Sequence, residues 1–222
     1  MAQVSADGLV TLVRGNDKQI IAVENLRREA YERAPEFQIA NRNAWAWTDA
    51  DVKGHVLAIW DREGNLLSTM RGIYASNRAE AEEQLECTMP LGSSWFPTII
   101  LEKAATAART ANKGLNALLR YMFIEAALQH KLGSVTGAVF EGAPRIKTLI
   151  ELGYQISLVE RMWDPNFHEH KPVHLVALPR KEMAMASLKL RTEFESTISR
   201  FQRDALIKLP IAHRDEVLDV ES

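Results

Sequence analysis

Hydrophobic and polar positions in the first half of this chain follow two different periods. Residues 9–14 alternate as in a strand, whereas apolar side chains recur at helical spacing over residues 17–33. Residues 34–50 follow neither period. Two β-rich runs, at 55–61 and 66–74, are then separated by a short turn that contains glycine and asparagine. This arrangement predicts a strand, an amphipathic helix, an irregular segment and a β-hairpin.

The second half of the chain alternates strand-like runs with helical patterns. The predicted strands cover residues 98–105, 135–140, 154–162 and 173–178, and the predicted helices cover residues 78–86, 114–131, 144–152 and 181–205. Because hairpins and crossover helices alternate, we expect a mixed sheet in the α+β (α/β) class. We expect one domain over residues 1–180, followed by a C-terminal helix and an acidic tail over residues 181–222.

The composition fits one folded domain and gives no sign of nucleic-acid binding. The 222 residues are 46% hydrophobic, which is enough for a sizeable core. The formal net charge is -2 at pH 7, whereas nucleic-acid binding needs a concentrated basic surface. The single cysteine, Cys87, lies in no nucleophile motif and cannot form an internal disulfide. The sequence shows no secretory signal and no apolar run of membrane-spanning length, so we expect a cytoplasmic protein without a membrane span.

A turn of small residues leads from the strand at 98–105 directly into the helix that begins at Gly114. The first amides of a helix lack intrahelical partners and carry partial positive charge. Arg109 and Lys113 add formal charge beside them, and Gly114 lets the backbone approach a ligand closely. These features predict a pocket for a phosphate or diphosphate. The turn has neither the ending of a P-loop nor the three glycines of a dinucleotide fingerprint.

The segment at 111–116, Ala-Asn-Lys-Gly-Leu-Asn, resembles the turn with which GCN5-related N-acetyltransferases (GNATs) grip the pyrophosphate of coenzyme A. The family pattern is Arg/Gln-x-x-Gly-x-Gly/Ala, and Gly114 matches its central glycine. Ala111 stands where the family has Arg or Gln, and Asn116 stands where it has a small residue. Downstream, the Leu-Gly-Tyr sequence at 152–154 resembles the family's Leu-Gly-Phe ending of a short helix.

This resemblance covers roughly residues 55–178 and implies a mostly antiparallel central sheet flanked by helices. It also implies an acyl-coenzyme A or acyl-carrier-protein thioester as cosubstrate, with no tightly bound cofactor. The main chain at Ala104 and Thr106 would pair with the pantetheine arm. The phosphate end would be bound by Arg109, Asn112, Lys113, Gly114, Leu115 and Asn116.

Other segments resemble a narrower group, the long-chain N-acyl amino acid synthases and the acyl-homoserine-lactone synthases. These segments are the arginine-containing helix at 26–31, the Thr-Asp-Ala-Asp sequence at 48–51 and the hairpin that ends near Arg71. Glu102 matches a glutamate on their fourth strand, whereas Ala105 stands where they have an arginine. The resemblance implies transfer of a medium or long acyl group to the amine of an amino-acid-like or peptide acceptor, with Arg71 among the substrate-binding residues.

Glu102 is the candidate general base. Attack of an amine on a thioester requires loss of a proton, polarisation of the carbonyl and close positioning, but no nucleophilic triad. Glu102 follows an apolar run on a strand that we expect to be central, where partial burial would raise its pKa. A structural pairing with Lys103 or Arg71 remains an open alternative. The tyrosine that many GNATs use as general acid is replaced by Leu149.

Two loops carry large aromatic side chains. Phe37, Trp45 and Trp47 precede the predicted hairpin, while Trp95 and Phe96 precede the strand that carries Glu102. They are candidates for a groove that holds an acyl chain or an apolar acceptor. Ordinary packing is the alternative that we favour, because large aromatic side chains are mostly buried.

Three histidines, His168, His170 and His174, lie close together in the sequence. Their spacing matches no mechanistic metal motif and Pro172 interrupts it, so we expect a surface loop and no metal site. Three alternatives to long-chain acyl transfer stay open. They are acetyl transfer to a small molecule or protein, thioester binding without turnover, and use of the helix at 181–205 for homodimerisation or another interaction.

Overall fold

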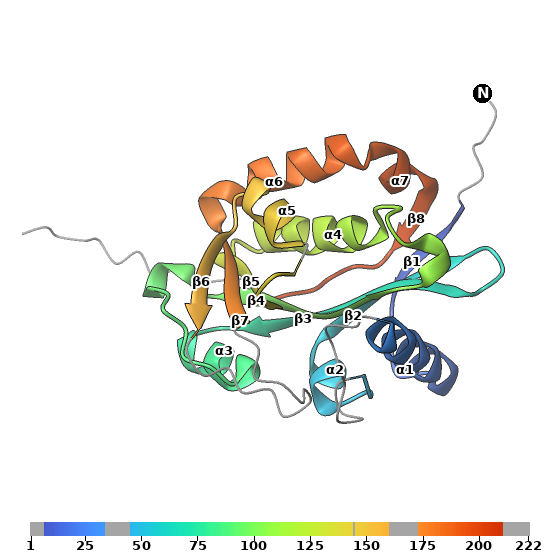
Figure 1. The fold of residues 1–222 in the computed structure, drawn as a ribbon, viewed down its shortest axis with the longest axis horizontal. Coiled ribbons are helices and arrows are strands. Elements are labelled where there is room, and N and C mark those ends of the chain that lie inside the picture. The colour runs from blue at the N-terminus through green and yellow to red at the C-terminus, as the bar shows by residue number, and fades with distance from the viewer. Residues whose placement is uncertain (1–6, 34–44, 144, 160–172, 211–222) are drawn as a thin grey trace, which may run out of the picture.

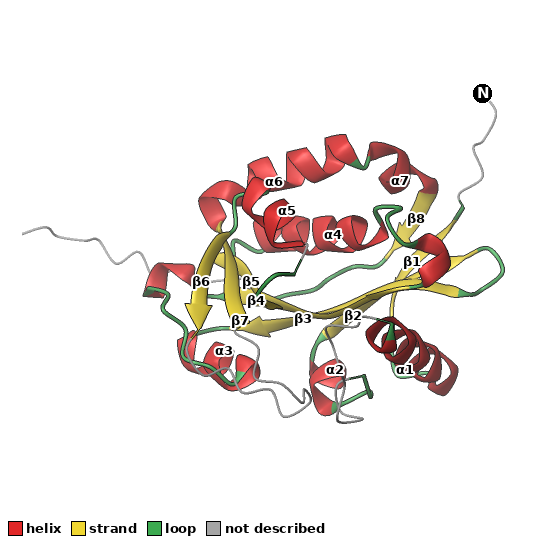
Figure 2. Ribbon diagram, in the orientation of Figure 1, coloured by secondary structure: helices red, strands yellow, loops and turns green. Residues whose placement is uncertain are grey.

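The computed structural model describes residues 7–33, 45–143, 145–159 and 173–210, which form a mixed sheet with helices on both faces (Figures 1 and 2). The strands are β1 (Gly8–Leu12), β2 (His55–Asp61), β3 (Leu66–Ala75), β4 (Thr98–Thr106), β5 (Ser134–Phe140), β6 (Gln155–Val159), β7 (Val173–Pro179) and β8 (Phe201–Asp204). The helices are α1 (Asp17–Glu32), α2 (Asp49–Lys53), α3 (Arg78–Leu85), α4 (Leu115–Gln129), α5 (Arg145–Glu151), α6 (Arg180–Glu193) and α7 (Glu195–Arg200). Two short 3-10 helices lie at Ser93–Trp95 and Ala108–Thr110.

The strand order across the described sheet is β6-β7-β5-β4-β3-β2-β1-β8. Its ladders are antiparallel except where β4 meets β5 and where β1 meets β8. The predicted mixed, mostly antiparallel sheet is therefore confirmed. Both strands at the β4–β5 junction are central, so the one parallel pair inside the sheet lies at its middle.

Helices cover the two faces unequally. Helices α4, α5, α6 and α7 lie on one face, and α1, α2 and α3 lie on the other (Figure 1). Nine of the 15 residues of α4 are buried, because this helix packs between the sheet and α6. A helix that is apolar around most of its circumference needs such cover on two sides. The largest part of the core therefore lies on the α4 face of the sheet.

Local capping explains where the helices beside β2 and β3 begin. The side chain of Asn16 accepts a hydrogen bond from the Lys18 amide at 2.9 Å and starts α1. Thr48 and Asp51 form a capping box that starts α2. The α2 helix begins at the end of the segment 34–50 that the sequence predicts to be irregular, and its cap fixes Asp51 beside the sheet.

The C-terminal region differs from the single helix predicted over residues 181–205. The helix breaks at Phe194 into α6 and α7, and residues 201–204 instead form β8. That strand pairs in parallel with β1 and buries Phe201. Completing the open edge of β1 outweighs helical propensity here, because a strand edge leaves main-chain groups unpaired. The acidic tail predicted after Pro210 lies outside the described residues.

Candidate functional site

Strands β4 and β5 pair along only part of their length. Their ladder ends at the Leu101–Gly137 pair, although β4 continues to Thr106 and β5 continues to Phe140. A Cβ atom on Gly137 would lie 2.8 Å from the carbonyl oxygen of Leu101, so glycine permits this close approach just before the strands separate. Beyond that point the facing edges of the two strands are not paired with each other. The Thr106 carbonyl oxygen accepts a hydrogen bond from Arg33 Nη2 at 3.0 Å, and main-chain groups left unpaired along this edge can bind another molecule.

A β-bulge in β4 produces the separation. Arg71 of β3 lies opposite Glu102, but Thr69 lies opposite Ala105, so β4 carries one extra residue over this stretch. Lys103 adopts a left-handed backbone conformation with a φ of 45°. A bulge bends its strand and redirects the adjacent side chains. Here it brings both Glu102 and Lys103 to the opening between the strands.

A cavity of about 400 Å³ occupies this opening. Its charged and polar lining comes from β4, α1, α4, α5 and β5: Glu102, Lys103, Thr106, Tyr31, Arg120, Arg145 and Thr136. Its apolar lining comes mainly from Met70, Leu101, Ala104, Val139, Leu149 and Val176. This volume lies within the range of sites that bind small molecules, and the mixed lining suits a ligand with both polar and apolar parts.

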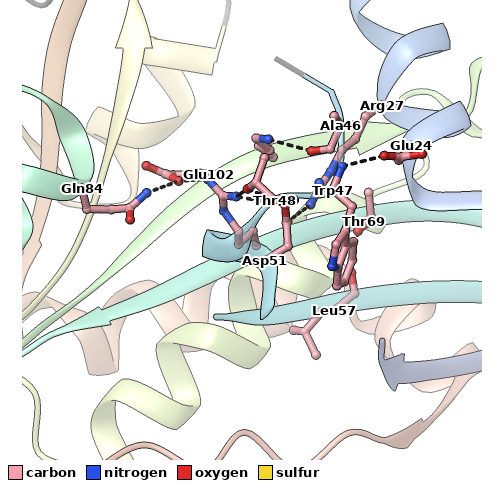
Figure 3. A network of polar contacts seen from close by, with 12 residues as sticks. Glu24, Arg27, Ala46, Trp47, Thr48, Asp51, Leu57, Thr69, Gln84 and Glu102 are labelled. Atoms are coloured by element: carbon pink, nitrogen blue, oxygen red, sulfur yellow. Dashed lines mark hydrogen bonds and ion pairs between the residues drawn. The ribbon is translucent and has the colours of Figure 1, made fainter. Parts of the chain in front are cut away.

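A chain of ion pairs leads from α1 along one face of the sheet to the edge of the cavity (Figure 3). Arg27 Nη2 lies 2.7 Å from Asp51 Oδ1. Arg71 bridges two carboxylates, with Nη1 3.2 Å from Asp51 Oδ2 and Nη2 2.5 Å from Glu102 Oε2. Gln84 of α3 donates a hydrogen bond from Nε2 to the same oxygen of Glu102 at 3.2 Å. The network therefore fixes the carboxylate of Glu102 from two sides.

The inner part of this network is isolated from solvent. The side chains of Arg27 and Asp51 are both 0% exposed. Burial alone would raise the pKa of Asp51, but the hydrogen bond from Arg27 and the charges of Arg27 and Arg71 hold it below its usual value. Thr48 donates two further hydrogen bonds to Asp51 Oδ2, from its amide at 2.9 Å and its hydroxyl at 3.1 Å. Buried charges are tolerated when they are paired and hydrogen-bonded in this way.

Glu102 has the pairing with Arg71 that the sequence leaves open, and its role as general base stays a prediction. Its pairing with Arg71 is the structural role, since Arg71 is itself buried and needs an anionic partner. Its side chain is nevertheless 16% exposed and lines the cavity, where a reacting group can reach it. Arg71, predicted to bind substrate, lies one side chain behind Glu102 and does not line this cavity. Its geometry suits holding Glu102 in place.

Lys103 and Arg27 are the site residues that sequence reasoning missed as functional candidates. Lys103 Nζ donates a hydrogen bond to the carbonyl oxygen of Ala46 at 3.0 Å and lines the cavity. Desolvation, together with the charges of Arg71 and Arg27, lowers the pKa of Lys103 to about 8. The sequence places Lys103 beside Glu102, but side chains next to each other on a regular strand point to opposite faces. The bulge that brings both to one opening leaves no signal in the hydrophobic pattern.

The predicted donor-binding residues divide into two groups. Ala104 and Thr106 line the cavity, whereas the six residues assigned to the phosphate end do not. At the turn before α4, a Cβ atom on Gly114 would overlap the ring of Phe194. The carbonyl oxygen of Lys113 accepts a hydrogen bond from the Thr197 hydroxyl at 3.0 Å. The junction of α6 and α7 therefore packs against one side of this turn.

The remaining residues of the turn differ in how far they are exposed to solvent. Arg109 is exposed and pairs with Asp61, with Nη2 3.2 Å from Oδ2. Asn112 is exposed in a left-handed conformation, Leu115 is buried in the core, and Asn116 is partly buried. Binding of a diphosphate by this turn stays a prediction.

The predicted substrate-binding aromatic residues pack around the network and the core. The Trp47 amide donates to Glu24 Oε1 at 2.8 Å, and its ring centroid lies 6.0 Å from the guanidinium carbon of Arg27. Trp45 lies in the same way over Arg28, at 5.5 Å. Farther along the same face of the sheet, Trp95 and Phe96 pack against the small apolar cluster beside α3. None of these four lines the cavity, and Phe37 lies outside the described residues.

The thiol of Cys87 is poorly suited to act as a nucleophile. Cys87 is buried, and desolvation, with a contribution from Glu82, raises the pKa of its thiol to about 11.

Within the described ranges, no group of three or more His, Cys, Asp and Glu side chains could hold a metal ion. His168 and His170 lie outside those ranges. No helix among the described residues is long and apolar enough to cross a membrane.

No protein-family model matches the sequence, and no curated protein matches it. Solved structures match through their fold. The acyl-homoserine-lactone synthase LasI aligns with a TM-score of 0.57 and 12% identity, covering 83% of this chain and 96% of that chain. BjaI, a coenzyme A-dependent acyl-homoserine-lactone synthase solved with SAM and isopentyl-CoA, aligns with a TM-score of 0.56 and 11% identity, covering 90% and 95%.

FeeM, an N-acyl amino acid synthase from uncultured soil microbes, aligns with a TM-score of 0.55 and 13% identity, covering 85% of this chain and 99% of that chain. Similarity at this level of identity shows the fold alone. The fold is that of the GNAT superfamily, in the form found in acyl-homoserine-lactone and N-acyl amino acid synthases. This confirms the fold that the sequence resemblance predicts.

Proposed function

We propose that this chain is an N-acyltransferase that moves an acyl group from a pantetheine thioester to an amine. The main support for the proposal is the opening between β4 and β5. There an unpaired strand edge, a cavity of about 400 Å³ and a carboxylate fixed by Arg71 and Gln84 meet at one β-bulge. The fold shared with acyl synthases supports the same reaction class.

Each feature of the opening has a role in this reaction. The main chain of Ala104 and Thr106 pairs with the amides of the pantetheine arm, which places the thioester carbonyl beside the bulge. Glu102 accepts a proton from the attacking amine, the carbon–sulfur bond breaks, and the pantetheine thiolate leaves. Lys103, whose pKa is about 8, is mainly a cation at pH 7, and its charge stabilises the oxyanion that develops on the carbonyl. Leu149 has no proton to give the thiolate, which therefore takes one from water.

The lining of the cavity supports an acyl group longer than acetyl. Met70, Leu101, Val139, Leu149 and Val176 provide apolar surface beyond the bulge. Burial of each methylene group in such surroundings contributes about 0.8 kcal/mol. We therefore propose a medium or long acyl group, carried by coenzyme A or an acyl carrier protein, and an amino-acid-like or peptide amine as acceptor. BjaI is a coenzyme A-dependent synthase, which supports coenzyme A as donor.

The test measures release of free thiol from acyl-coenzyme A thioesters of increasing chain length, with a panel of amino acids and amines. We expect thiol release that depends on the amine and increases with chain length beyond acetyl. Mass spectrometry of the products identifies the acylated amine. Binding of the thioesters without amine-dependent thiol release from any pair would contradict the proposal and support thioester binding without turnover.

A further inference from the structure

Two arginines enter the cavity from the face opposite the ion-pair network. Arg120 comes from α4 and Arg145 begins α5, and both helices lie on the same face of the sheet (Figure 1). The proposed chemistry at Glu102 uses neither of them. Two cations beside a mainly apolar cavity therefore need a separate explanation.

A neutral partner orients Arg120 without neutralising it. Its Nη1 donates a hydrogen bond to the Tyr154 hydroxyl at 3.1 Å, and its guanidinium carbon lies 5.6 Å from the centroid of the same ring. Among the described residues, neither Arg120 nor Arg145 forms an ion pair with a carboxylate. Glu102, the carboxylate that lines the cavity, is already paired with Arg71.

The surroundings make this pair of cations electrostatically unfavourable without a ligand. Arg145 is exposed at the start of α5, but local desolvation still lowers its pKa, and the nearby charge of Arg120 lowers it further. An arginine remains protonated even so, and the repulsion between the two guanidinium groups therefore persists. Across the cavity, desolvation raises the pKa of Tyr31, which keeps its hydroxyl protonated as a donor. An anion between these groups would offset the repulsion and accept their hydrogen bonds.

We propose that Arg120 and Arg145 bind a compact oxyanion inside the cavity, as part of a substrate of the proposed acyl transfer. Guanidinium groups match the geometry of phosphate and carboxylate oxygens. One source of such an anion is the phosphate of a phosphopantetheine donor. The other is a carboxylate on the transferred acyl group or on the acceptor. This site lies on α4 and α5 and is separate from the turn at Gly114.

Inorganic pyrophosphate is the first probe, because it tests the anion site without a thioester. Calorimetric titration compares the unchanged chain with Arg145→Gln and with Arg120→Gln/Arg145→Gln. We expect the double substitution to weaken pyrophosphate binding by about 10- to 100-fold, the range expected for lost charged hydrogen bonds. Lys147→Gln is the matched control, because Lys147 is an exposed cation on α5 that does not line the cavity. Thermal unfolding confirms that each variant is folded.

The single substitution protects the test against a folding defect, because Arg145 is exposed at the start of α5. Arg145→Lys should recover part of the affinity, since it keeps the charge. Unchanged pyrophosphate affinity in the variants, or no pyrophosphate binding by the unchanged chain, would overturn the proposal.

Two ligand pairs then distinguish the sources of the anion. The first is 4′-phosphopantetheine against pantetheine, and the second is succinyl-pantetheine against butyryl-pantetheine. In one outcome, the double variant loses affinity for the charged compound of one pair and keeps its affinity for the neutral compound of that pair. This result supports the proposal and identifies whether the anion is the phosphate or the carboxylate. Equal losses for the charged and neutral members would contradict it. If pyrophosphate binds at the arginines but no pantetheine compound binds, the anion site stands and the proposed acyl transfer fails.

Discussion

The two faces of the sheet at β4 differ in whether their charged side chains are paired with charges of opposite sign. On the face of α1 and α2, Arg27, Asp51, Arg71 and Glu102 form consecutive ion pairs, and the inner pair is fully buried. On the face of α4 and α5, Arg120 has a tyrosine as its hydrogen-bond partner and Arg145 has no described ion pair. Charges that neutralise each other define the geometry of the protein, whereas charges held near one another without an anion favour a ligand. The cavity lies between these two arrangements.

Glu102 ends the ion-pair network at the cavity. Its substitution should have the largest effect on turnover. Glu102→Gln keeps the shape of the side chain but removes the proton acceptor. We expect turnover to fall by about 10²- to 10⁴-fold, the usual contribution of a general base. Affinity for the thioester should change little, because the strand edge remains. Glu83→Gln, on the exposed side of α3, is the control. Turnover unchanged by Glu102→Gln would leave Glu102 a purely structural role.

Asp51→Asn should disrupt the ion-pair network, because Asp51 pairs with both Arg27 and Arg71. The substitution leaves two buried arginines without their shared anion, which costs about 3–5 kcal/mol in the free energy of unfolding. Urea unfolding followed by circular dichroism measures this loss. Asp49→Asn is the control, because Asp49 lies exposed in the same first turn of α2. A loss below about 1 kcal/mol would show that Arg27 and Arg71 do not depend on Asp51.

Lys103→Met should have a smaller effect whose size depends on pH. The folded-state pKa of Lys103 is about 8 and its ordinary value is 10.5, so between these values the unfolded chain holds more protons. The stability contributed by this group therefore rises as pH increases from 8 to 10.5. At pH 7 the substitution removes a partly desolvated cation and should stabilise the chain by on the order of 1 kcal/mol.

The gain from Lys103→Met should shrink as pH approaches 10.5. Urea unfolding of both proteins at pH 7, 9 and 10.5 follows this trend, and Lys53→Met provides an exposed control from the end of α2. A gain that stays constant with pH would mean that Lys103 titrates as an exposed lysine does.

Arg109→Gln should have the smallest effect on stability. The Arg109–Asp61 pair is largely solvent-exposed on the arginine side, with 57% and 23% of the two side chains accessible. Exposed pairs contribute at most about 1 kcal/mol, and usually less. Urea unfolding should therefore show a change close to the error of the measurement. A larger loss would indicate that the turn before α4 depends on this pair.

Much of the fold could be predicted because local pattern and tertiary packing agree. The strand at 55–61 is found at the predicted residues, and the helix predicted at 114–131 is α4 at Leu115–Gln129. The β8 strand could not be predicted in this way. Its four residues continue a helical pattern, and only the open edge of β1, nearly 200 residues earlier in the chain, turns them into a strand.

The pairing of Glu102 with Arg71 could be predicted, because both residues stand out in the sequence. The candidate site was not predictable where geometry arises from a bulge or from contacts between distant segments. The bulge places Lys103 at the opening, and the position of α5 on the same face as α4 brings Arg145 to the cavity that Arg120 also lines. The packing of Phe194 against Gly114 joins two segments 80 residues apart. None of these contacts has a periodic signal in the sequence.

The central claim is that the unpaired edge of β4 binds the pantetheine arm, and hydrogen–deuterium exchange tests it most directly. Exchange is measured with and without a saturating, unreactive thioether analogue of a long-chain acyl-coenzyme A. We expect slower exchange in residues 102–106 and in 137–140, where the two strands separate. Saturation with no protection in either segment would contradict it, whatever protection is found elsewhere in the chain.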